Sequence, residues 1–415
     1  MVQIRIAVST TPIVSVLAFI AMFAGFQGGR YLYANRLQEL GIFCALLLFV
    51  WGAWLSLFRL QKSEWRNWTY KPSVLLLGIM LLGSITFALN FSDNVLFSFF
   101  ASREYLLGFL GPGLFLLCRS GYPIEHFERV FWCVLLALLI NYLYFYATLD
   151  LRATFFSPDH TVSNLVTYDE WRGFRLKPPT FAIMVALMAS LLLILRFGFT
   201  IQLLMALLMF GLSVYIWSIV QFRSTLATML LAMFLYPLLL RRPERLQYFW
   251  LLSPLIILAT PIVFHMVLEQ FAGADGGGLR LRSFQTALGG FMERPMLGAG
   301  EDNSYGKTYQ MLYGKTFYPS DLGMVGTLFK YGAFGLGLYL YVHVHIVRSL
   351  LIANARYADV YGRHNALLWA VLMFSVAQTF NLILNPGLSY APGITMGSVG
   401  LALAGLWRVH LSFAK

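Results

Sequence analysis

Runs of about 20 mainly apolar residues recur along this chain, and they constrain its fold more than any other feature. In hydrocarbon only helices and closed barrels satisfy their backbone polar groups, and the runs are continuous where barrel strands would alternate. Of the 415 residues, 59% are hydrophobic and 12% charged, and the mean hydropathy is +0.70. We therefore predict an all-α polytopic membrane protein with about twelve spans, at residues 11–27, 40–58, 73–91, 104–118, 127–149, 178–195, 199–219, 224–240, 247–268, 322–347, 366–384 and 391–411.

Basic residues indicate the orientation of these spans. With both termini in the cytoplasm, the inner loops carry clusters of Lys and Arg, as the positive-inside bias requires. The clusters are Arg59/Lys62/Arg66/Lys71, Arg119/Arg129, Arg241/Arg242/Arg245 and Arg348/Arg356/Arg363. The long polar loops then face the outer side of the membrane.

Two long outer loops divide the chain into five parts. The predicted parts are amino-terminal helices (1–149), a first loop (150–178), central helices (179–269), a large loop (270–321) and carboxy-terminal helices (322–415). The large loop contains a predicted amphipathic helix, Leu281–Met292, that ends before Pro295, and then Gly298, Gly300 and Gly306, which indicate tight turns. Together the two loops are expected to form an extracytoplasmic cap.

Several functions are excluded by what the sequence lacks. Cys44, Cys118 and Cys133 stand singly in or beside apolar runs, and no Cys/His spacing typical of a metal site occurs. No Gly-rich loop followed by Lys and Ser/Thr is present to hold a nucleotide phosphate. We therefore predict no metal and no cofactor. We also predict no nucleic-acid partner, because the net charge of +12 is explained by loops that face anionic lipid.

Arginines on the outer side oppose the expected charge bias. Among them are Arg172, Arg175, Arg223, Arg280 and Arg282. Guanidinium groups match phosphate oxygens in geometry, so this set suggests an anion site. Ordinary ion pairing with the acids of the same loops is the alternative.

Four stretches resemble, in order, the O-antigen ligase and O-antigen polymerase superfamily. The stretch R-L-R-S-F-Q-T-A-L-G-G-F-M-E-R-P-M-L-G-A-G (280–300) is similar to its outer-loop signature. The stretch D-L-G-M-V-G-T-L-F-K-Y-G-A-F-G-L-G-L-Y-L (321–340) resembles its entry into the next helix. Q-F-R-S-T (221–225) and F-R-L-K-P-P-T-F-A (174–182) resemble two upstream pieces. Where the family carries His, this chain has Asp321.

The resemblance implies a metal-independent, inverting glycosyltransferase in the bacterial inner membrane, with its active site on the periplasmic side. Its donor would be an undecaprenyl-pyrophosphate-linked glycan and its acceptor a glycan or glycolipid, with the lipid bilayer and polysaccharide chain-length or export proteins as further partners. Asp321 in place of His favours a polymerase of the O-antigen or exopolysaccharide kind. The alternatives are an O-antigen ligase that attaches glycan to lipid A core, a lipid-linked glycan flippase, and a non-catalytic assembly protein.

Such chemistry needs cations for the leaving pyrophosphate and a base for the acceptor hydroxyl. Arg280 and Arg223 are the predicted catalytic cations, and Arg175, Arg282 and Arg172 are predicted donor-binding residues. Each has an alternative as an ordinary surface or helix-end arginine.

Asp321 is the predicted base, and its alternatives are a helix cap or an arginine partner. His160 is a second candidate for the base. Tyr305, Tyr309 and Tyr313 are either sugar-stacking platforms or the core of the loop.

Overall fold

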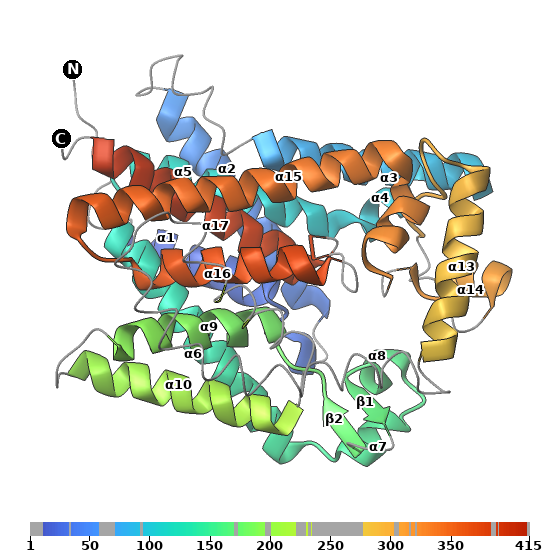
Figure 1. The fold of residues 1–415 in the computed structure, drawn as a ribbon, viewed down its shortest axis with the longest axis horizontal. Helices are drawn as coiled ribbons and strands as arrows, with labels where there is room; N and C mark the ends of the chain where they lie inside the picture. Colours follow the sequence, from blue (N-terminus) through green and yellow to red (C-terminus); the bar gives the residue numbers. More distant parts are fainter. Residues whose placement is uncertain are drawn as a thin grey trace.

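The computed structural model describes residues 11–32, 35–57, 71–91, 94–169, 173–195, 201–220, 230, 234, 277–302, 307–314, 317–319, 322–382, 387–388 and 390–412. Within these ranges the chain is mostly helical, and most of the long helices run along a common axis (Figure 1). Five described helices are long and apolar enough to cross a membrane. This architecture agrees with the predicted all-α membrane class.

The helices of the bundle follow the apolar runs of the sequence. The five long ones are α2 (Asn35–Leu57), α3 (Lys71–Phe91), α6 (Ile124–Thr148), α10 (Ile201–Val220) and α15 (Gly323–Tyr361). The shorter or less apolar ones are α1 (Thr11–Gly25), α9 (Thr180–Ile194), α16 (Ala366–Asn381) and α17 (Ala391–Ser412). Each overlaps one of the predicted spans. The predicted spans 224–240 and 247–268 lie outside the described residues except for positions 230 and 234.

Both segments that were predicted as long loops lie at one end of the bundle (Figure 1). α13 (Gly277–Glu293) and α14 (Lys307–Tyr313) lie beyond the ends of α3 and α15. α15 runs away from this end, α16 returns, and α17 finishes at the opposite end. We call the end that carries α13 and α14 the loop end. The predicted cap requires both loops to lie at the same end of the bundle.

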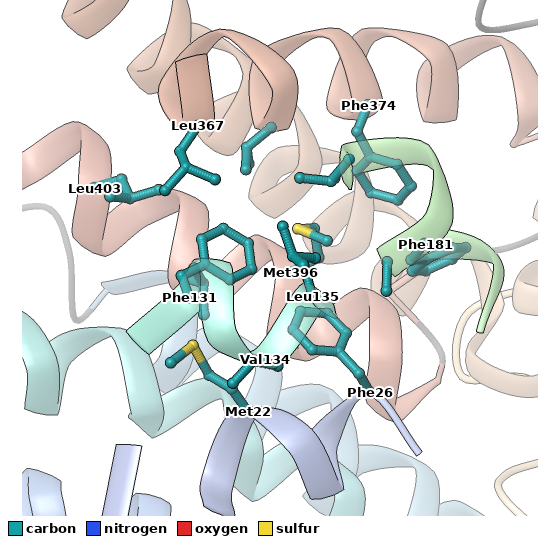
Figure 2. Close-up of a cluster of buried hydrophobic side chains, with 14 of the residues drawn as sticks. Met22, Phe26, Phe131, Val134, Leu135, Phe181, Leu367, Phe374, Met396 and Leu403 are labelled. Atoms are coloured by element: carbon teal, nitrogen blue, oxygen red, sulfur yellow. The ribbon is translucent and has the colours of Figure 1, made fainter. Parts of the chain in front are cut away.

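The centre of the bundle is a packed apolar core made by helices from both halves of the chain. Figure 2 shows side chains of α1, α6, α9, α16 and α17, and of the turn after α1, meeting there. All the labelled side chains are less than 9% exposed: Met22, Phe26, Phe131, Val134, Leu135, Phe181, Leu367, Phe374, Met396 and Leu403. Dispersion contacts of this kind hold helices together in lipid, where apolar burial alone gives little net gain.

The predicted helix 104–118 has a different structure. A 3-10 helix, η4 (Arg103–Phe109), leads into the short α5 (Leu110–Arg119). Pro112 stands in the first turn of α5, where its missing N–H costs no hydrogen bond. The preceding chain is held by side chains, because the Gly108 carbonyl accepts hydrogen bonds from Ser73 Oγ (2.6 Å) and Ser398 Oγ (2.8 Å). The prediction of one regular helix was therefore wrong here.

The helix that contains the predicted span 322–347 extends well beyond it. α15 continues to Tyr361 and stops at Gly362, whose left-handed backbone (φ 65°) lets its N–H reach the Ala358 carbonyl. The extension persists because one face of it, with Leu350, Ala353 and Tyr357, stays buried in the bundle.

The first long loop, 150–178, is more ordered than predicted. Two short helices, α7 (Leu151–Phe155) and α8 (His160–Ser163), precede an antiparallel hairpin of β1 (Val166–Asp169) and β2 (Gly173–Leu176). Another short helix that was not predicted, α4 (Val95–Ala101), follows α3. α13 confirms the predicted amphipathic helix, although it begins at Gly277 inside the glycine run.

The first testable prediction concerns the close packing of α5. A Cβ at Gly111 would lie 2.1 Å from the Ser398 carbonyl oxygen, which is fixed backbone. We expect Gly111→Ala to destabilise the protein by about 1–3 kcal/mol, the usual cost of overpacking. The matched control is Gly78→Ala in α3, where a Cβ would meet nothing within 4 Å. Chemical unfolding in mixed micelles should show the control at or above wild-type stability. Equal stability of both variants would contradict the close packing of Gly111 against Ser398.

Candidate functional site at the break in helix α15

α15 is broken at Gly332, where the backbone (φ 65°, ψ −172°) leaves the helical conformation. Residues 295–302, which follow α13, pack into this break, and we call them the inserted segment. Four backbone hydrogen bonds join the two: Ala299 N–H to Phe329 O (2.8 Å), Gly300 N–H to Lys330 O (2.7 Å), Ala333 N–H to Pro295 O (2.9 Å) and Phe334 N–H to Met296 O (3.2 Å). The groups released by the break are thus paired again, as buried backbone requires.

Glycines make this close approach possible. Gly298 (φ 72°) and Gly300 (φ 101°) adopt left-handed conformations that favour glycine. A Cβ at Gly298 would lie 2.6 Å from the Lys330 carbonyl, and one at Gly300 would lie 2.2 Å from Phe87 N. The tight turn predicted at Gly298 is confirmed, because its N–H donates to the Arg294 carbonyl at 2.9 Å. The N–H of Gly300 bonds to Lys330 instead of closing a turn, and Gly306 lies outside the described residues.

An ion pair lies beside the break. Glu301 accepts a hydrogen bond from Lys330 Nζ at 2.7 Å, and the two side chains are 19% and 14% exposed. The Tyr331 hydroxyl donates to the second oxygen of the same carboxylate and lies 3.0 Å from the Tyr105 hydroxyl. The Glu301 N–H donates to the Gly83 carbonyl of α3 at 3.0 Å. Two α15 side chains therefore hold the carboxylate, while η4 and α3 hold Tyr331 and the Glu301 backbone.

Asp302, the next residue, organises the start of α14. Its buried carboxylate accepts from Thr308 N–H (3.0 Å), Thr308 Oγ1 (3.1 Å) and Tyr309 N–H (3.4 Å). The Tyr309 hydroxyl donates to the Gly300 carbonyl at 2.7 Å. Burial, followed by the nearby Glu301 and Asp302 carboxylates, raises the pKa of Tyr309 well above its ordinary value. The phenol therefore stays protonated and keeps this hydrogen bond.

Arg294 is positioned at the entrance to the inserted segment. Its guanidinium carbon lies 5.6 Å from the centre of the Phe91 ring, at the end of α3. One of its nitrogens, Nη1, is buried and has no hydrogen-bond partner within the described part of the chain. Leaving a charged donor buried and unbonded is costly, so this group is suited to donate a hydrogen bond to an anionic oxygen of a ligand.

Several predicted site residues lie outside the described residues. These are Asp321, Arg223, Arg172 and Tyr305. Arg280 belongs to the first turns of α13 and His160 to α8, and neither side chain is described. Arg282 is exposed on α13 at the loop end.

The other predicted site residues lie in two places. Arg175 is on β2, and its Nη1 donates to the carbonyl of Val220, the last residue of α10, at 3.0 Å. Tyr309 is 1% exposed and packs against Phe329, with ring centres 5.1 Å apart. Tyr313 also contacts that ring at 5.6 Å. In this arrangement Tyr309 belongs to the loop core and presents no open face to a sugar.

The Glu301–Lys330 pair and Arg294 were not predicted as site residues. A signal for Lys330 was present, because it is the only charged residue in the predicted span 322–347. Ionisable residues inside membrane spans usually have a function. Arg294 had no comparable signal, since its neighbour Phe91 is far away in the sequence.

Comparison with protein families and with curated proteins gives no match. No protein-family model matches this sequence, and no curated protein is significantly similar to it. The resemblance to the O-antigen ligase and polymerase superfamily therefore depends on the sequence motifs alone, and the activity that it implies is a proposal.

The second testable prediction concerns the ion pair beside the break. Lys330→Met removes the cation and leaves the largely buried Glu301 carboxylate without its ion-pair partner, which should cost about 2–3 kcal/mol of stability. The double variant Lys330→Met/Glu301→Gln should recover part of this loss, since no charge is then left uncompensated.

The control for this experiment is the more exposed Arg103–Glu39 pair (3.2 Å), whose side chains are 29% and 57% exposed. Arg103→Met should cost less than about 1 kcal/mol. Unfolding in mixed micelles gives all four stabilities. Equal effects of Lys330→Met and Arg103→Met would show that the pair at the break is an ordinary surface pair.

Proposed function

We propose that this protein is an integral-membrane glycosyltransferase that polymerises glycan from an undecaprenyl-pyrophosphate-linked donor at the periplasmic face of the bacterial inner membrane. The principal support is the order of the four stretches that resemble the O-antigen ligase and polymerase superfamily, from residue 174 to residue 340. An O-antigen ligase, which shares these motifs, is the alternative.

The arrangement of basic groups at the loop end supports this proposal. Arg282 lies exposed on α13, and Arg294, with its unbonded buried nitrogen, follows the last residue of the same helix. Arg175 lies on β2 next to the end of α10. Arginines suit a pyrophosphate, which carries several negative charges.

The proposed reaction needs no metal in its chemistry. The acceptor hydroxyl oxygen forms a bond to the anomeric carbon of the donor sugar, while the bond from that carbon to the pyrophosphate oxygen breaks. The lipid pyrophosphate leaves with the electron pair, and arginines stabilise its charge. The proton of the hydroxyl passes to a base, for which Asp321 is our candidate.

The third testable prediction concerns the two proposed catalytic arginines. Arg forms planar, bidentate contacts with phosphate whereas Lys is a point charge. Arg280→Lys and Arg223→Lys should each lose most transferase activity on a purified lipid-linked donor while expression stays normal. Arg356→Lys is the matched control, because Arg356 lies in the distal half of α15, away from the loop end. Full activity in both test variants would show that these arginines only balance charge.

The product of the same assay separates the alternatives. A ladder of products from one donor indicates a polymerase, and transfer to lipid A core indicates a ligase. Translocation of the donor across proteoliposomes without a new glycosidic bond indicates a flippase. Activity of the whole pathway that survives charge-neutral replacement of Arg280 indicates an assembly protein.

The fourth testable prediction concerns Asp321. If Asp321 is the base, Asp321→Asn should lower turnover by about 10²–10⁴-fold, as for other losses of a general base, with donor binding almost unchanged. If it is the partner of an arginine, the variant should weaken donor binding instead. If it only stabilises the start of α15, where Leu322 is the N-cap residue, turnover should not change. Wild-type turnover would therefore remove Asp321 from the mechanism and leave His160 as the next candidate.

A further inference from the structure

Helix α13 has more apolar surface than the protein buries. Its buried stripe consists of Ser283, Ala287 and Gly290. A second stripe is apolar but exposed: Phe284 is 40%, Leu288 37% and Met292 76% exposed. These three residues are four positions apart, so they line one side of the helix.

Two charged residues of α13 occupy a third side. Arg282 and Glu293 are both exposed there, whereas the exposed Gln285 lies close to Met292, seven positions away. At about 100° per residue, the buried, apolar and polar stripes are each separated by roughly a third of a turn. A helix that contacts protein on one side and water on the other needs only a buried face and a polar face. The exposed apolar face of α13 therefore requires a third environment.

The position of α13 indicates what those surroundings are. α3 contains 21 residues, which at about 1.5 Å each is close to the thickness of the hydrocarbon core, about 30 Å. Its last residue, Phe91, contacts Arg294, which directly follows α13. Figure 1 shows α13 lying across the bundle axis at this end. α13 is therefore at the level where hydrocarbon meets water.

Neighbouring elements at the loop end continue the exposed apolar surface. In the turn after α13, Met296 and Leu297 are 64% and 45% exposed. On α4, which packs along α3, Leu96 and Phe97 are 63% and 64% exposed. Apolar exposure on this scale marks a contact surface.

We propose that α13 is an interfacial helix that inserts its Phe284–Leu288–Met292 stripe into the lipid leaflet at the loop end. Its buried stripe then contacts the bundle, and its polar stripe faces water at the level of the lipid headgroups. This inference goes beyond the proposed function and does not depend on it, because it concerns only the surface that α13 presents to the bilayer.

The test, our fifth prediction, measures the depth of each stripe directly. Cys44, Cys118 and Cys133 are replaced, and single cysteines at Leu288, Met292 and Glu293 are labelled with an environment-sensitive fluorophore. The protein is reconstituted in phosphatidylcholine/phosphatidylglycerol vesicles. Doxyl-labelled lipid should quench the probes at Leu288 and Met292 several-fold more than the probe at Glu293. Aqueous iodide should show the reverse order.

Two results would overturn the proposal. Iodide quenching at Leu288 and Met292 equal to that at Glu293 would place the apolar stripe in water. Protection of both probes from lipid and from iodide would show that a protein, either a second copy or another partner, covers the stripe. Since all three positions are exposed, the labelled variants should fold, and normal chromatographic behaviour in detergent confirms this before reconstitution. Quenching needs no catalysis, so this outcome is separate from that of the transferase assay.

Discussion

Every buried peptide group in this bundle must find a hydrogen-bond partner, and the structure depends most on that constraint where α15 breaks. At Gly332 the helical hydrogen-bond pattern of α15 is interrupted. The inserted segment replaces it with backbone hydrogen bonds to Phe329, Lys330, Ala333 and Phe334. Non-helical backbone survives at membrane depth only where protein or a water-filled cavity surrounds it. The break therefore fixes the path of the segment that joins α13 to the bundle.

The inserted segment and its contacts place charged groups at two different heights along α3. The Glu301–Lys330 pair lies beside Gly83, whereas Arg294 lies over Phe91, eight positions further along the helix. Eight helical residues correspond to about 12 Å. The compensated pair is thus the deeper one, and the guanidinium with an unbonded nitrogen is nearer the loop end. This order is reasonable on electrostatic grounds, because desolvating an unpaired charge costs more than desolvating a paired one.

The sequence predicted the bundle well because continuous apolar runs and helix formation are local properties. It also predicted α13 and the turn at Gly298, since glycine and proline signal helix ends and turns at their own positions. It missed the hairpin of β1 and β2, and it missed the 3-10 helix before α5, which depends on distant contacts. The Gly108 carbonyl, for example, is held by Ser398, 290 residues away. Arg294 was missed for the same reason, whereas Lys330 could have been recognised from its charge alone.

The proposed chemistry and the proposed membrane contact impose related demands on α13. A lipid-linked donor keeps its tail in hydrocarbon and its pyrophosphate at the headgroup level, so cations that bind it must be held at that boundary. Three different faces on one helix can meet this demand, because packing through Ala287 fixes the helix to the bundle and the Leu288 side sets its depth. The exposed Arg282 is then at the height of a phosphate by geometry, before any ligand is present. A helix anchored only by protein contacts would need other elements to set that height, whereas an interfacial helix takes it from the bilayer itself.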